Sequence, residues 1–125
     1  MNYITNTNTI IFDYKYNEEL DIELISGYSK LIFSNYKLSK KLFKSYANCD
    51  FDGLKYGGSK FDKDVSKLPS SLRQINFGCW FNRDVFTLPP TLTHLTFGKY
   101  FNRDVSALPP SLTHLTFECD FNQNV

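Results

Sequence analysis

A 20-residue repeat in the second half of the chain constrains its fold more than any other feature. The segment 81–97 is followed by a near copy at 101–117. Four phenylalanines mark the same interval: Phe61, Phe81, Phe101 and Phe121. Self-similarity at a fixed period in this range is typical of a solenoid, in which similar units stack and bury their apolar faces on one another.

Each unit contains a short apolar motif that predicts a β-strand. In the motif Leu92-x-x-Leu95-x-Phe97, the last two residues are two positions apart and therefore point to the same side of an extended chain. His94 and Thr96 then point to the other side. The preceding Leu88-Pro89-Pro90 predicts the turn into the strand, because consecutive prolines cannot occupy a central ladder. We expect one short parallel strand per unit.

The same motif can be followed backwards through the chain. A pair of apolar residues two positions apart begins at residues 10, 31, 54, 75, 95 and 115, which gives units of about 20 to 23 residues. We therefore predict a mostly β, leucine-rich-repeat-like solenoid with about six coils and little helix. Residues 1–125 form a single domain, with divergent repeats and an N-terminal cap in 1–60 and regular repeats in 61–125. Residues 18–25 could form a short helix or an irregular connector, and propensity alone does not decide between them.

Composition and charge exclude several classes of protein. The formal net charge is +1, with no basic segment, which argues against nucleic-acid binding. No apolar run of about 18 residues predicts a membrane span, and the N-terminus lacks the features of a secretory signal. The three cysteines include no C-x-x-C pair. Cys79 and Cys119 lie two coils apart, about 10 Å, which exceeds the reach of a disulfide. We expect reduced thiols and a cytoplasmic location.

The repeats in 61–125 resemble a known family. Their pattern, Leu-Pro-(Ser/Pro)-(Ser/Thr)-Leu-x-x-(Leu/Ile)-x-Phe-Gly-x-x-Phe-Asn-x-x-Val, is similar to the FNIP repeat, a relative of the leucine-rich repeat. The Phe-Asn-Ile-Pro of that family is Phe-Asn-Arg-Asp at 81–84 and 101–104. Such repeats are most abundant in slime moulds and in giant viruses of amoebae, so a viral protein would act in the host cytoplasm. The resemblance implies a solenoid used for protein recognition. Some members carry an F-box that would link them to ubiquitin ligases, and residues 1–60 show no such segment.

The strand face that points away from the core is the candidate partner-binding surface. Its proposed residues are Gln74, Asn76, His94, Thr96, His114 and Thr116. The two histidines occupy identical repeat positions, but a metal site needs three or four ligands and the preceding coil offers Gln74. We therefore predict neither a metal nor any other cofactor. At the N-terminal end, Ile11 and Ile32 would make an apolar spot covered by residues 1–8 or by a partner.

A second set of repeated polar residues has a structural interpretation. Asn82, Asn102 and Asn122 recur at one repeat position, with Asn17 and Asp62 as weaker members. An asparagine side chain can satisfy backbone groups of its own turn and of the next coil. The repeated Arg-Asp pairs predict a surface ion ladder of small energetic value. We predict no catalytic residues, because nothing encloses a carboxylate pair or positions a nucleophile.

These observations favour a non-enzymatic module that binds a protein partner through its exposed strand face. The alternative is a structural element that self-associates through its C-terminal coil, where no cap is recognisable in the sequence. A substrate-recognition role in a ubiquitin-ligase adaptor rests on the family resemblance alone.

Overall fold

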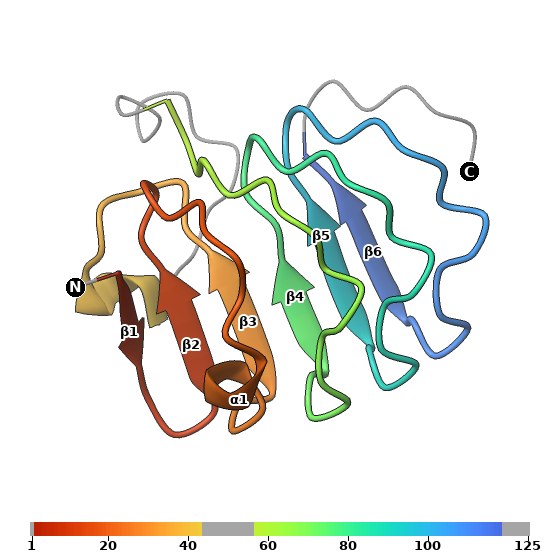
Figure 1. Ribbon diagram of the computed structural model, residues 1–125, viewed down its shortest axis with the longest axis horizontal. Coiled ribbons are helices and arrows are strands. Elements are labelled where there is room, and N and C mark those ends of the chain that lie inside the picture. The colour runs from red at the N-terminus through yellow and green to blue at the C-terminus, as the bar shows by residue number, and fades with distance from the viewer. Residues whose placement is uncertain (1, 44–56, 119–125) are drawn as a thin grey trace.

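One sheet runs through the length of the molecule. The computed structural model describes residues 2–43 and 57–118, and its strands follow one another in sequence order from β1 to β6 (Figure 1). β1 pairs antiparallel with β2, and every later neighbour is parallel. The strand bounds are Tyr3–Thr5 (β1), Thr9–Phe12 (β2), Lys30–Phe33 (β3), Gln74–Asn76 (β4), His94–Phe97 (β5) and His114–Phe117 (β6).

The parallel strands lie in the register that the repeat predicts. The inward residues Ile10, Leu31, Ile75, Leu95 and Leu115 form one continuous column of paired positions. All but the last are buried, because each is covered by the equivalent residue of the next coil. The prediction of a mostly β, leucine-rich-repeat-like solenoid with parallel strands is confirmed.

Turns before the strands close each regular coil. The amide of Leu92 donates to the carbonyl of Pro89 at 3.2 Å, and Leu112 repeats the contact with Pro109 at 3.3 Å. The next amide then joins the preceding coil, with Thr113 donating to the carbonyl of Thr93 at 2.9 Å. Proline therefore stands where no ladder hydrogen bond is required, and the ladder begins as soon as the turn is complete.

Two columns of aromatic rings fill the core. One column follows the ends of the strands, with centroid spacings of 5.5 to 5.8 Å along Phe12, Phe33, Phe77, Phe97 and Phe117. The second follows the return path, with spacings of 6.0 to 6.1 Å along Tyr16, Phe61, Phe81 and Phe101. Within a coil the two columns stack on each other, as Phe97 does on Phe101 at 3.8 Å. Ring stacking at these spacings fixes the separation between coils.

The count of six coils is corrected to about five, and residues 54–56, where a further strand was predicted, lie outside the described residues. β3 pairs directly with β4, with Leu31 opposite Ile75, so no rung lies between them. Phe33 stacks on Phe61 at 4.0 Å as the two rings of a single coil. The chain between them is therefore an insertion into that coil, and residues 44–56 of it lie outside the described residues. Leu42, which lies within this insertion, belongs to a separate cluster from the core.

One buried side chain joins the two ends of this insertion. The side-chain oxygen of Asn35 accepts hydrogen bonds from the amide of Ser59 at 2.9 Å and from the amide of Cys79 at 2.8 Å. Asn35 is fully buried, and so an unpaired amide beside it would be costly. The insertion can therefore leave and rejoin the coil without disturbing the stacking of the rungs on either side.

Segment 36–43 covers the outward face of the N-terminal strands. Ile11 and Ile32 are buried in a cluster with Leu42, which lies in the 3₁₀ helix η1 (Lys40–Phe43). Ile4 of β1 packs against the same cluster. In Figure 1, η1 lies on the side of the sheet opposite the return path. The apolar spot predicted at Ile11 and Ile32 is thus closed by the chain itself.

The helices of the described residues are short. In the stretch where a helix or a connector was expected, the single turn α1 spans Ile22–Ile25, with Asp21 as its N-cap. The Asp21 carboxylate accepts from the amide of Leu24 at 3.2 Å, which satisfies one of the free donors at the helix start. No described helix has the length and apolar character needed to cross a membrane.

Candidate functional site

The six residues proposed for partner binding lie together on the outward face of β4, β5 and β6. Gln74, His94 and His114 are paired across these strands. Asn76, Thr96 and Thr116 form the neighbouring row. The structure therefore brings the six into one grid of two rows, three strands wide. The equivalent face of β2 and β3 is closed by segment 36–43, so the grid is the open part of this face.

The two histidine rings are stacked on one another. Their centroids are 4.1 Å apart and their planes differ by 7°. In each coil the threonine hydroxyl before the histidine lies 2.8 Å from the ring Nδ1, as Thr93 does beside His94 and Thr113 beside His114. The same hydroxyls donate to carbonyls of the preceding coil, both at 3.1 Å. The rings are therefore held by the contacts that join the coils.

This arrangement couples the tautomer of the neutral imidazoles to the direction of the threonine hydrogen bonds. A hydroxyl has one proton, which Thr93 can donate either to the carbonyl of Arg73 or to Nδ1 of His94. When it donates to the carbonyl, its oxygen accepts a proton from Nδ1, which leaves the lone pair on Nε2. The same reasoning applies to Thr113 and His114. Each ring can thus accept a hydrogen bond at Nε2 and present a polar, polarizable edge to a partner.

Exposure increases along the grid toward β6. Gln74, His94 and Thr96 are half-buried, whereas His114 and Thr116 are exposed. Asn76 is only 8% exposed, and its side-chain oxygen accepts from the side-chain Nε2 of Gln74 at 3.3 Å. Asn76 is therefore a poor candidate for direct contact. Its role is better described as holding Gln74 in place on the surface.

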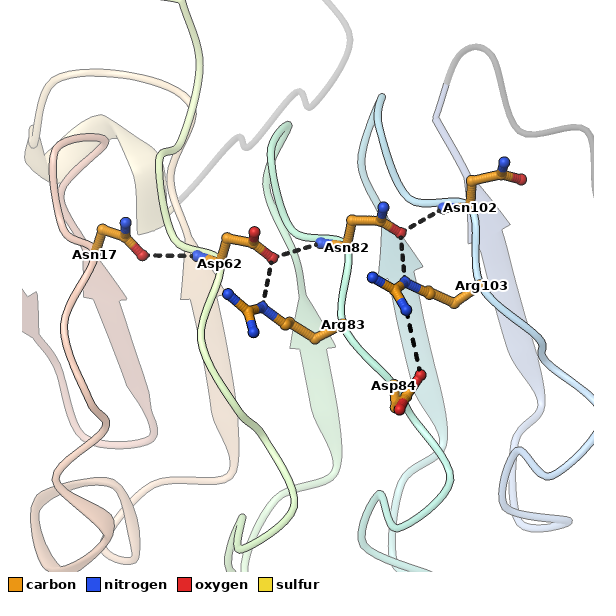
Figure 2. Close-up of polar contacts among 7 residues, drawn as sticks. All are labelled: Asn17, Asp62, Asn82, Arg83, Asp84, Asn102 and Arg103. Atoms are coloured by element: carbon orange, nitrogen blue, oxygen red, sulfur yellow. Dashed lines mark hydrogen bonds and ion pairs between the residues drawn. The ribbon is translucent and has the colours of Figure 1, made fainter.

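The repeated asparagine positions form a chain of hydrogen bonds on the return path (Figure 2). The side-chain oxygen of Asn17 accepts from the amide of Asp62 at 2.9 Å. Asp62 accepts from the amide of Asn82 at 2.9 Å, and Asn82 accepts from the amide of Asn102 at 3.0 Å. Each oxygen therefore joins its own coil to the next one. Asn122, the last predicted member, lies outside the described residues.

Arginine side chains reinforce the same oxygens. Arg83 Nε donates to Asp62 at 3.2 Å, and Arg103 Nε donates to Asn82 at 3.2 Å. The guanidinium of Arg103 also lies 3.6 Å from the Asp84 carboxylate (Figure 2). These side chains are largely exposed, and solvent screening keeps each ion pair weak. These contacts join neighbouring coils, and the carboxylates of Asp62 and Asp84 do not form an enclosed pair.

An exposed aromatic pair was missed by the sequence analysis. Trp80 and Tyr100 are 43% and 41% exposed and stack at 4.3 Å. Trp80 donates from its indole nitrogen to the carbonyl of Gly57 at 2.7 Å, and the Lys60 ammonium lies 5.5 Å from the Trp80 ring centroid. The sequence could have indicated this pair, because Trp80 and Tyr100 occupy the same repeat position, 20 residues apart, and neither belongs to the two ring columns of the core.

Metal and thiol chemistry find little support in the part of the chain that is described. Across residues 2–43 and 57–118, no three His, Cys, Asp or Glu side chains gather in the manner of metal ligands. Cys79 is buried and free, and burial raises the pKa of its thiol. Cys49 and Cys119 lie outside the described residues.

Comparison with known proteins agrees with the repeat architecture. The FNIP Repeat family matches residues 64–99 and 81–120. Among solved structures, the chain is similar to CroV588, described as a novel circular LRR protein structure, with a TM-score of 0.62 and 26% sequence identity. The match covers 98% of this chain but only 19% of the CroV588 chain.

The match to CroV588 thus spans about a fifth of that protein's length. None of the curated proteins matches the sequence. The family match coincides with the coils in which proline turns, aromatic columns and the asparagine chain are all present. Residues 64–120 of this chain therefore match the FNIP repeat, and the described part of them stacks as a solenoid of the leucine-rich-repeat type.

Proposed function

We propose that the chain is a non-enzymatic module that binds a protein partner through the outward face of β4, β5 and β6. Repeat solenoids of this type generally suit protein–protein interaction, because stacked units present an extended, regular surface. The observation that carries the proposal is that this face is covered over β2 and β3 and becomes increasingly exposed from β4 to β6.

The order of the surface supports recognition. The stacked rings of His94 and His114 are held by hydroxyls that also bond the backbone. These side chains are already ordered, so binding a partner would cost this face little side-chain entropy. The six residues of this surface include no Asp, Glu, Lys or Arg, so specificity would come from hydrogen bonds and shape rather than from long-range steering.

The experiment compares partner capture by two double variants. Tagged wild-type protein and the variant His94→Glu/His114→Glu are used to capture proteins from a lysate of the natural host, and the bound proteins are quantified by mass spectrometry. The control is Thr87→Glu/Ala107→Glu, which places the same two charges on exposed, equivalent positions of the return path. We expect the histidine variant to lose the captured partner and the control to retain it. Equal capture by both variants, with unchanged circular dichroism, contradicts the proposed surface.

Self-association through β6 is a second candidate function. Thr113, His114, Leu115 and Thr116 are exposed, and Leu115 belongs to the column of inward residues yet is 40% exposed. An exposed strand edge with an apolar residue is a template for pairing with another chain. Light scattering across a dilution series would detect such pairing, and Leu115→Lys should abolish it. A constant monomer mass at all concentrations rules this function out.

A further inference from the structure

A cavity of about 740 Å³ lies at the N-terminal end of the aromatic core. Its apolar wall is made by Tyr3, Phe12, Tyr16 and Leu24. The size falls within the range of sites that hold a small ligand or a few residues of a peptide. The sequence analysis predicted no site here, because the residues come from β1, β2 and the following connector and share no repeat position.

The cavity exists because the aromatic columns end there. Inside the solenoid each ring is stacked on the equivalent ring of the neighbouring coil, as Tyr16 is on Phe61 at 6.0 Å with planes 14° apart. At the end of the column, Tyr3 meets Phe12 at 5.8 Å with an interplanar angle of 59°. The tilted ring does not continue the stack. Phe12 and Tyr16 are only 2% and 9% exposed, so a further flat group would lie mainly against the partly exposed ring of Tyr3.

Acidic side chains line the other side of the same cavity. Glu18, Glu19 and Asp21 all contribute to the lining, and none of its described residues is basic. The hydroxyl of Tyr16 donates to the carbonyl of Glu19 at 3.0 Å, which fixes the ring below these carboxylates. Burial, followed by the charges of Glu18, Asp21 and Glu19, raises the pKa of Tyr16. The electrostatic potential at the Tyr16 ring is therefore negative.

We propose that this cavity binds an arginine side chain from a basic peptide segment of a partner protein. A guanidinium is flat, stacks on aromatic faces and matches the oxygens of a carboxylate with two parallel donors. The aromatic wall and the acidic side of the cavity supply these two kinds of contact at one place. The cavity is larger than one side chain requires, which leaves room for the neighbouring residues of the peptide.

The site differs from the outward face in position and in chemistry. Its walls belong to the end of the core and the connector that follows β2, whereas the grid of histidines and threonines lies on β4 to β6. The two surfaces can therefore be tested independently. Loss of binding at one leaves the other unaffected.

The test uses fluorescently labelled peptides of glycine and serine with a central pair of arginines, measured by fluorescence anisotropy against the full chain. Two matched peptides replace arginine by lysine or by citrulline, which keeps the shape of arginine without its charge. We expect the arginine peptide to bind at least about tenfold more tightly than either, because lysine lacks the planar group with two parallel donors and citrulline lacks the charge. Equal binding of the arginine and lysine peptides would show attraction by charge alone and overturn the proposal.

Variants locate the binding on the molecule. The double variant Glu18→Gln/Glu19→Gln should lower the affinity for the arginine peptide at least about tenfold. The matched control is Glu23→Gln, an exposed carboxylate on α1 that does not line the cavity, and it should leave the affinity unchanged. Urea unfolding of each variant shows whether the fold is retained. The inference fails if the arginine peptide does not bind, or if both variants weaken it equally.

Discussion

Removing the side-chain oxygens of the return path one at a time should destabilise the solenoid in a graded order. The three positions are equivalent but make different numbers of contacts. Asn17 accepts one hydrogen bond, from the amide of Asp62. Asn82 accepts two, from the amide of Asn102 and the Arg103 guanidinium. Asp62 accepts two with a full negative charge on the acceptor, from the amide of Asn82 and the Arg83 guanidinium.

The expected losses follow from these contacts. A neutral hydrogen bond contributes about 0.5–1.5 kcal/mol, and exposed donors can bond to water instead, which favours the lower end. We expect about 0.5 kcal/mol for Asn17→Ala, about 1–1.5 kcal/mol for Asn82→Ala and about 2 kcal/mol for Asp62→Ala. The last is the largest because the amide of Asn82 is partly buried and a charged acceptor strengthens the bond. The Asp62–Arg83 pair itself is exposed and screened, so it adds little.

Urea denaturation followed by circular dichroism measures these differences as shifts in the midpoint at constant slope. Asn82→Asp is the control, because an aspartate occupies the equivalent position in the preceding coil and accepts the same two kinds of bond. It should be as stable as the wild type. The reasoning is refuted if the three alanine variants lose equal stability, if the order is reversed, or if Asn82→Asp is as unstable as Asn82→Ala.

Three further predictions concern the core and the stacking of the coils. Phe81→Ala should cost about 3–5 kcal/mol in urea unfolding, because the ring is fully buried among other rings, whereas Phe86→Ala, at a 52% exposed position, should stay within about 0.5 kcal/mol. Gly98→Ala should cost about 1–3 kcal/mol, because its Cβ would meet the backbone of Gly78, while Gly27→Ala, with open space around it, should be neutral or slightly stabilising by the same measurement. In a Cys49→Ser/Cys119→Ser background, Cys79 should react slowly with a thiol reagent at neutral pH, because burial raises the pKa of its thiol. The reaction should become faster only as the pH rises above the usual range for cysteine. Rapid labelling of the native protein at neutral pH would contradict this prediction.

The regular half of the chain is predictable because several independent signals recur at one interval. Leu95 and Phe97 set the inward side, the proline turn sets the start of the strand, and Asn82 and Asn102 occur at one repeat position. Each signal alone is weak, but a shift of one residue would break all of them together. This redundancy explains why the register of β4, β5 and β6 follows directly from the sequence.

The first half lacks that redundancy, and the strand predicted at residues 54–56 shows the consequence. Two apolar residues two positions apart occur often by chance in a chain rich in Phe and Tyr. The decisive contacts are long-range: Asn35 joins the ends of the insertion, and Phe33 stacks on Phe61. No local pattern marks these partners. Residues 1–8 were expected to cover Ile11 and Ile32, and Ile4 does pack there, but the contribution of segment 36–43 was missed because Leu42 reaches them only through the course of the inserted segment.

The structure also separates the repeated polar residues by what remains for a partner to use. On the return path the oxygens of Asp62 and Asn82 are occupied by the amide and the guanidinium of the next coil. On the outward face each threonine hydroxyl contacts both a carbonyl of the preceding coil and Nδ1 of the histidine that follows it. The Nε2 lone pairs of His94 and His114 are not used in either set of contacts. Repetition alone therefore does not distinguish structural from recognition residues. The occupied oxygens assign the asparagines to the solenoid, whereas the histidine edges are the contacts that we propose for a partner.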